Sequence, residues 1–111
     1  MSEPETVIAI YRVQADREAE FFQVLAKHHP TLRAVDLVTE EPPIVYRGTE
    51  GDGAPIVFEI FTWKDGEAAE TAHHMPEVMA VWEPLGEMCE QRGGKPKFEF
   101  PHVVRKSLPV G

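Results

Sequence analysis

The sequence predicts an α+β domain with the element order β-α-β-β-α-β, and three observations lead to this prediction. Runs of β-branched and aromatic residues indicate four strands, apolar residues at helical spacing indicate two helical regions, and a glycine-rich turn joins the two middle strands. A chain of 111 residues is close to the usual size of one domain. We therefore expect residues 1–111 to form a single domain.

Four segments are expected as strands: residues 6–13, 44–49, 55–63 and 97–105. The turn GDGA at residues 51–54 joins the second and third into a hairpin, because glycine tolerates positive φ. The first and third strands are apolar on both faces, whereas a strand with one solvated face alternates. In the last strand, Pro101 predicts an edge position or a bulge.

Two helical regions separate these strands. The first should run from Asp16 to the EEPP segment at residues 40–43, with Pro30 dividing it. Its predicted apolar stripe is Ala19, Phe22, Leu25 and Ala26. The second should begin after Asp65 and break near Pro76. Its stripe is Val78, Val81, Trp82, Leu85, Met88 and Cys89, so we expect the cysteine to pack in the core.

This order in a four-stranded antiparallel sheet, with the first and third strands at its centre, is the ferredoxin-like arrangement. Two helical regions can cover only one face of the sheet, yet the central strands are apolar on both faces. An uncovered apolar face implies a partner. Two sheets packed face to face would form a dimeric α+β barrel, so we expect a homodimer through the sheet face.

The composition limits the partners and the location. The formal net charge is −8, which disfavours nucleic acid and anionic membrane surfaces, since both need clustered lysine and arginine. No apolar run approaches the ~20 residues that span a membrane. No basic region precedes the first apolar run, so no signal peptide is expected. A single cysteine fits the cytoplasm, which is the expected location.

Glu59 is the most informative single residue. It lies in the middle of the third strand, on the same side as Val57 and Phe61. A carboxylate among apolar neighbours must find a partner, and we expect Arg12 or His102 to provide it. Two interpretations remain open: a salt bridge on the sheet or at the dimer rim, or a general base or ligand anchor inside the barrel.

Two histidine pairs precede prolines in the sequence. His73 and His74 point about 100° apart on a helix, so both cannot easily bind one metal ion, and no metal site is expected. One of them could lie at the rim of a pocket, or both could be solvated. The other pair, His28 and His29, is typical of a helix end.

Three stretches together resemble a known family. They are VIAIYRV at residues 7–13, FEIFTW followed by Lys64 and Asp65, and AAETAH at residues 68–73. The chain resembles the antibiotic biosynthesis monooxygenase-like domains of the dimeric α+β barrel superfamily. In this resemblance Trp63 matches a tryptophan that commonly ends the third strand, and His73 or His74 matches a histidine common in the following helix.

The resemblance implies a function as well as a fold. Monooxygenases of this group use no metal or flavin, because their electron-rich phenol substrate reduces oxygen itself, so no cofactor is expected. The implied ligand is a small, mostly apolar or aromatic molecule. The candidate residues are His73, His74 and Glu59 for proton chemistry, and Tyr11, Phe61, Trp63 and Trp82 for binding. The alternative is a non-catalytic homodimeric module that binds a small molecule or another partner. An enzyme needs a cavity with convergent polar groups, whereas such a module can have a filled core.

Overall fold

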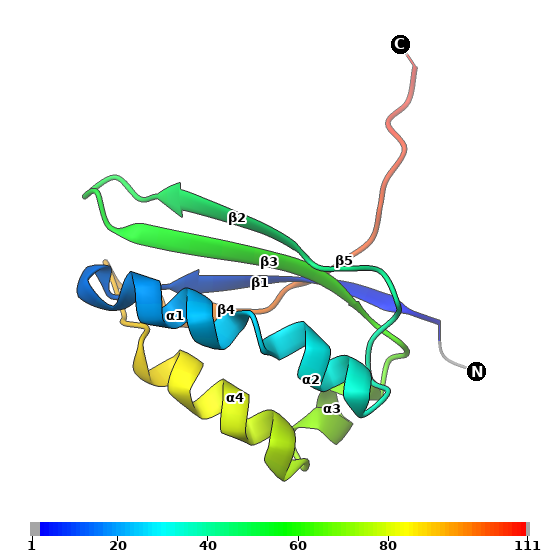
Figure 1. The fold of residues 1–111 in the computed structure, drawn as a ribbon. Helices are drawn as coiled ribbons and strands as arrows, with labels where there is room; N and C mark the ends of the chain where they lie inside the picture. Colours follow the sequence, from blue (N-terminus) through cyan, green and yellow to red (C-terminus); the bar gives the residue numbers. More distant parts are fainter. Residues whose placement is uncertain (1–2, 111) are drawn as a thin grey trace.

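The computed structural model describes residues 3–110 and confirms the α+β, ferredoxin-like fold. In chain order its elements are β1 (Glu5–Arg12), a 3₁₀ turn η1 (Ala15–Arg17), α1 (Glu18–Leu25), α2 (His28–Ala34), β2 (Ile44–Thr49), β3 (Pro55–Trp63), α3 (Ala68–Ala72), α4 (Pro76–Glu87), β4 (Phe98–Glu99) and β5 (His102–Val103). Figure 1 shows the helices gathered below one face of the sheet.

The sheet has the order β2-β3-β1-β4, and β5 also pairs with β1. All of these pairings are antiparallel, and β1 and β3 are the central pair, as predicted. Glu59 on β3 lies between Ala9 of β1 and Val45 of β2. Because side chains alternate along a strand, these three residues share one face of the sheet with Tyr11. That face looks onto the helices.

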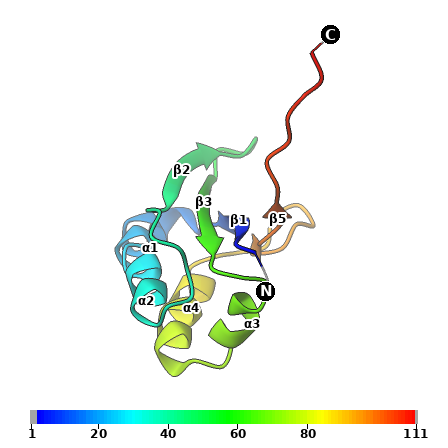
Figure 2. The same cartoon turned by 90° about the vertical axis from the view of Figure 1, so that its right-hand side faces the viewer.

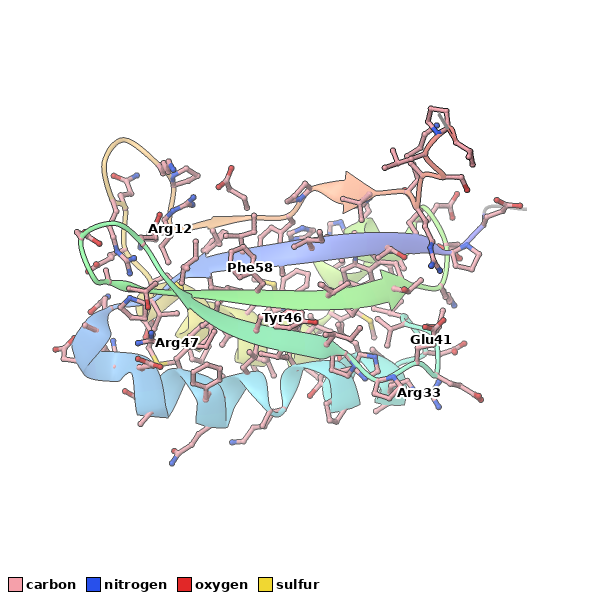
Figure 3. The ribbon with its side chains drawn as sticks, turned by 90° about the horizontal axis from the view of Figure 1, so that it is seen from above. Arg12, Arg33, Glu41, Tyr46, Arg47 and Phe58 are labelled. Carbon is pink, nitrogen blue, oxygen red and sulfur yellow. The ribbon has the colours of Figure 1, made fainter. Side chains whose placement is uncertain are left out.

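The other face of the sheet is uncovered in this chain. Figure 2 shows the sheet and the helices as two layers. Figure 3 shows the molecule from the side of the open face, where Phe58 and Tyr46 are labelled. Ile44 is 53% exposed and Tyr46 is 60% exposed. The apolar side chains on one face of the sheet therefore pack against the helices, and those on the other face form an open apolar surface.

The predicted stripe on the first helical region is wrong at Ala19 and Ala26, which are exposed, whereas Leu25 is buried and Phe22 packs half-buried against the core. The helices α1 and α2 instead bury residues spaced 4, 3 and 4 apart: Phe21, Leu25, His28 and Leu32. Phenylalanine and leucine bury more apolar surface than alanine, so they determine which side of the helix faces the sheet. A histidine thereby takes a core position on α2.

The predicted break in the second helical region is confirmed. Met75 has an extended backbone (φ −108°, ψ 116°), as the residue before a proline prefers, and Pro76 begins α4. Cys89 packs in the core, and its burial raises the pKa of the thiol to about 11. The interruption at Pro101 is also observed, since it separates β4 from β5. Within residues 3–110, no helix is long and apolar enough to cross a membrane.

Candidate functional site

A buried hydrogen-bond network centres on Glu59, whose side chain is 1% exposed. His28 Nδ1 lies 2.8 Å from Glu59 Oε1 and 3.1 Å from Oε2. The Tyr11 hydroxyl donates to Oε1 at 3.0 Å, and Trp82 Nε1 donates to His28 Nε2 at 2.8 Å. We call these four residues the Glu59 network. It joins β1, α2, β3 and α4, so the fold as a whole brings it together.

The partners expected for Glu59 were wrong. Arg12 lies on the opposite face of the sheet, where its guanidinium Nη1 pairs with Glu99 at 2.9 Å. His102 pairs with Glu5 at 3.2 Å. The side chain of Arg12 alternates away from Glu59 because the two residues have opposite parity in the β1–β3 register. His28, 31 residues earlier in the chain, partners the carboxylate instead.

The hydrogen bonds of His28 determine its tautomer. An indole N–H can only donate, so the Nε2 that accepts from Trp82 carries no proton. The proton of the neutral ring is then on Nδ1, which donates to Glu59. His28 therefore presents a basic nitrogen toward Trp82 and is held from behind by a carboxylate.

Burial also acts on Tyr11. Desolvation raises the pKa of its hydroxyl well above 10.0, and the charge of Glu59 and the hydrogen bond to it raise it further. The hydroxyl thus remains a donor to Glu59 throughout the neutral range. Glu59 accepts from two neutral donors, and this arrangement satisfies a carboxylate without a second buried charge.

A cavity of about 450 Å³ adjoins the Glu59 network, between the helix-facing side of the sheet and α4. We call it the first cavity. Its volume lies within the ~300–1,000 Å³ typical of small-molecule sites. Aromatic rings dominate its walls, and the polar groups among them include Tyr11 and His28. The aromatic residues other than tyrosine and histidine are Phe61, Trp63, Trp82, Phe98 and Phe100.

Most of the predicted site residues meet at this first cavity. Tyr11, Phe61, Trp63, Trp82 and His73 all line it. The His73 ring packs edge-on against Trp82, with ring centroids 4.9 Å apart.

Two predicted catalytic residues lie elsewhere. The ring of His74 is exposed and pairs with Glu70 at 3.0 Å, outside the lining of the first cavity. Glu59 lies behind His28 and lines a different hollow. Among residues 3–110, no three His, Cys, Asp or Glu side chains are placed to hold a metal ion.

His28, which links Glu59 to the first cavity, was not among the site residues predicted from the sequence. Its signal was present in the spacing of Phe21, Leu25, His28 and Leu32, which puts the histidine on the core face of a helix. The neighbouring Pro30 favoured a helix-end interpretation, and α2 in fact begins at His28. A histidine in a core stripe, together with a carboxylate in a core strand, was the pattern that would have found the pair.

Comparisons with solved structures identify the fold. SnoaB of Streptomyces nogalater, a cofactor-independent oxygenase solved as a point variant, is 18% identical with a TM-score of 0.68, covering 98% of this chain and 100% of that one. A Caulobacter crescentus protein provisionally named an antibiotic biosynthesis monooxygenase is 19% identical with a TM-score of 0.64, covering 94% and 92%. This chain shares the fold of the antibiotic biosynthesis monooxygenases.

A third structure bears on assembly. A protein of unknown function from Jannaschia, described as a dimeric ferredoxin-like protein, is 14% identical with a TM-score of 0.63, covering 92% of this chain and 99% of that one. No protein-family model matches this chain, and no curated protein matches it. At these identities the similarity establishes the fold alone, and this is the fold that the sequence resemblance predicted.

Proposed function

We propose that this chain binds a small, mostly apolar aromatic molecule in the first cavity and acts on it as a cofactor-independent monooxygenase. The observation that carries the proposal is the His28–Glu59 pair at the wall of an aromatic cavity. SnoaB, which has the same fold, is a cofactor-independent oxygenase, and this supports the reaction class. An aromatic body fits the rings of Phe61, Trp63 and Trp82, which bind flat molecules through stacking and edge contacts.

In the proposed reaction, His28 Nε2 accepts the proton of a phenolic hydroxyl. Glu59 fixes the tautomer and stabilises the imidazolium that forms, as a carboxylate does behind the histidine of a hydrolytic triad. The resulting phenolate is richer in electrons and gives them to oxygen more readily. His73, at the same wall, is a second candidate proton acceptor. The proposed reaction assigns no step to His74, because its ring lies outside the cavity.

A binding module without catalysis is the second candidate, and one contact favours it. Trp82 Nε1–H occupies the lone pair of His28 Nε2, so a substrate hydroxyl must displace the indole before the base can act. If Trp82 holds this bond while a ligand is bound, the network serves to order the cavity wall rather than to move protons.

Oxygen consumption with a panel of electron-rich phenols distinguishes the two candidates. We expect consumption above the uncatalysed rate, without added flavin and in the presence of a chelator. His28→Gln keeps a donor for Glu59 but has no basic ring nitrogen, so it should lower the rate about 100-fold or more. His74→Gln is the matched control and should retain the rate. Saturable binding without oxygen uptake would favour the binding module. The absence of both binding and oxygen uptake would exclude both candidate functions.

We also propose that the protein is a homodimer through its open sheet face. Ile44 and Tyr46 are exposed on this face and Phe58 and Ile60 are half-buried there, and a soluble chain rarely leaves such an apolar surface unpartnered. The dimeric Jannaschia protein has the same fold, which supports this assembly. The proposed partners are thus a second copy and a small ligand, with no nucleic acid and no membrane, and the proposed location is the cytoplasm.

A further inference from the structure

The last described residues, 104–110, form a tail that leaves the rest of the molecule. Figures 1 and 2 show it rising from β5 on the open side of the sheet, away from the helices. The tail makes no hydrogen bond and no ion pair with residues 3–110. Val104 is 80% exposed, Leu108 is 84% exposed and Val110 is fully exposed. An exposed apolar segment of this kind indicates a surface that another molecule covers.

The tail has the sequence pattern of a strand. Val104, Leu108 and Val110 are an even number of residues apart, so all three lie on one side of an extended chain. Lys106 lies on the same side, and its aliphatic stem can cover apolar surface. Arg105 points to the other side. At ~3.3 Å per residue, an extended segment of this length reaches ~23 Å.

The edge strand β2 offers a surface that matches the tail. It pairs with β3 on one side only, and its backbone makes no other hydrogen bond among residues 3–110. Ile44, Val45 and Tyr46 are exposed along it. The strand has six residues and contains neither the proline nor the lysine that often protects a sheet edge. An edge of this kind binds extended segments as added strands.

The tail of the same chain is too short to run along this edge. β5 pairs with β1 on the side away from β3, so β1 and β3 separate the tail from β2. From β5 to the outer edge of β2 there are four inter-strand spacings of ~4.8 Å, or about 19 Å. Crossing them would use nearly the whole reach of the tail. The strand that completes β2 must therefore come from another molecule.

Charge and position favour a second copy of this chain as that molecule. The tail carries Arg105 and Lys106 and no acidic residue, whereas the chain as a whole has a formal net charge of −8. Glu40 and Glu41 are exposed just before β2 begins. In the proposed homodimer the second copy lies over the open face, which is the side on which the tail rises (Figure 1).

We propose that residues 104–110 are an arm that lies along β2 of a second copy as an added strand. This inference rests on the proposed homodimer through the open sheet face. A two-fold axis that runs along the strands, between the two sheets, places β2 of one copy over β5 of the other. Val103 pairs with Thr6, and Ile44 is level with Ile8 through Ile60, so each arm starts at the Ile44 end of the strand it joins.

Mixed dimers test where the arm lies. One copy carries a nitroxide on Ser107→Cys and no isotope label, and the other carries the isotope label alone, so NMR line broadening is intermolecular. Cys89 is buried and its thiol pKa is raised to about 11, so the label reacts at residue 107. We expect strong broadening at residues 44–49 and much weaker broadening at Ala80, which is exposed on α4.

A pair of variants tests the apolar side of the arm. Leu108→Asn and Ser107→Asn introduce the same side chain on opposite sides of an extended chain. Both residues are exposed, so neither change should affect the folding of the chain itself. Leu108→Asn should raise the dimer dissociation constant about tenfold or more, because a buried leucine is lost from the interface. Ser107→Asn should stay within about threefold of the unmodified protein. Sedimentation of a dilution series measures both constants.

The outcomes separate the arm from the other proposals. A dimer without intermolecular broadening at residues 44–49, or equal dissociation constants for the two variants, would overturn the arm and leave the homodimer standing. A monomeric unmodified protein would overturn the homodimer and the arm together. Failure to oxidise phenols would count against the proposed reaction alone.

Discussion

At the scale of single residues, Glu59 holds the polar part of an apolar interior together. Its isolation among apolar neighbours was visible in the sequence, and so was the need for a partner. The partner itself was not, because His28 comes from another element and its direction depends on how α2 packs. The residues that surround a buried charge are determined by tertiary structure, since sequence neighbours on a strand point to alternate faces.

Removing the Glu59 carboxylate should be costly. Glu59→Leu leaves the Tyr11 hydroxyl and His28 Nδ1–H buried without acceptors, so the free energy of unfolding should fall by about 2–4 kcal/mol. Urea unfolding measures the loss, and Glu83→Leu, at an exposed position on α4, is the matched control. Tyr11→Phe should cost about 1 kcal/mol alone but close to nothing in the Glu59→Leu background. Additive losses would show that Tyr11 and Glu59 are not coupled.

Tyr11 gives a prediction for alkaline pH. Its pKa in the folded protein is raised above 10.0, so the folded state keeps the hydroxyl proton that the unfolded state loses above that pH. Stability should therefore decline as pH rises above about 10, and the decline should be shallower in Tyr11→Phe. In Tyr46→Phe, where Tyr11 is the remaining tyrosine, absorbance at alkaline pH should show phenolate only as the protein unfolds. Phenolate formation in the folded protein near pH 10 would contradict this.

At the scale of elements, α2 ends without the glycine that usually marks a helix C-terminus in a sequence. The helix ends in a Schellman motif: Leu37 N–H donates to the Leu32 carbonyl and Asp36 N–H to the Arg33 carbonyl, both at 3.0 Å. Asp36 takes the left-handed conformation, with φ 58°, in the position that glycine usually occupies. The sequence therefore predicted a helical region that continued to residue 40, whereas α2 ends at Ala34.

Asp36→Gly should stabilise the protein by about 0.5–1 kcal/mol, because glycine adopts this backbone conformation without steric cost. The exposed contact of Asp36 with Lys64, at 3.5 Å, contributes little and should not offset the gain. Thermal or urea unfolding measures the change. Asp36→Ala removes the same carboxylate without relieving the backbone, so it should give no gain. Equal stability of the two variants would show that the backbone at residue 36 is unstrained.

At the scale of the whole molecule, one face of the sheet is left uncovered, unlike in a fold whose sheet is covered on both faces by the same chain. Strand pattern alone predicted that both faces of β1 and β3 would be apolar, and only one face is covered by helices. The surface that remains is a property of the complete sheet, because β2 extends it with Ile44 and Tyr46.

The homodimer can be tested on this face. The protein should sediment as a dimer at micromolar concentration, and Ile60→Lys should make it a monomer, because a charge in the centre of an apolar interface must be desolvated. Ala80→Lys adds the same side chain to an exposed position on α4 and should leave the dimer intact. Circular dichroism would establish that both variants are folded. A monomeric unmodified protein, or a dimeric Ile60→Lys variant, would refute the assembly.

The sequence by itself determined the element order, the hairpin, the helix break before Pro76 and the solitary carboxylate on a core strand. These features are local, since they depend on turn residues, proline and the periods of strands and helices. Only the tertiary structure decided that His28 pairs with Glu59 and that Trp82 donates a hydrogen bond to His28 Nε2. It also decided that cavities lie on both sides of the His28–Glu59 pair. The physical reason is that side-chain contacts between distant elements depend on how helices rotate against the sheet. That rotation is decided by the packing of large residues such as Phe21 rather than by any single stretch of sequence.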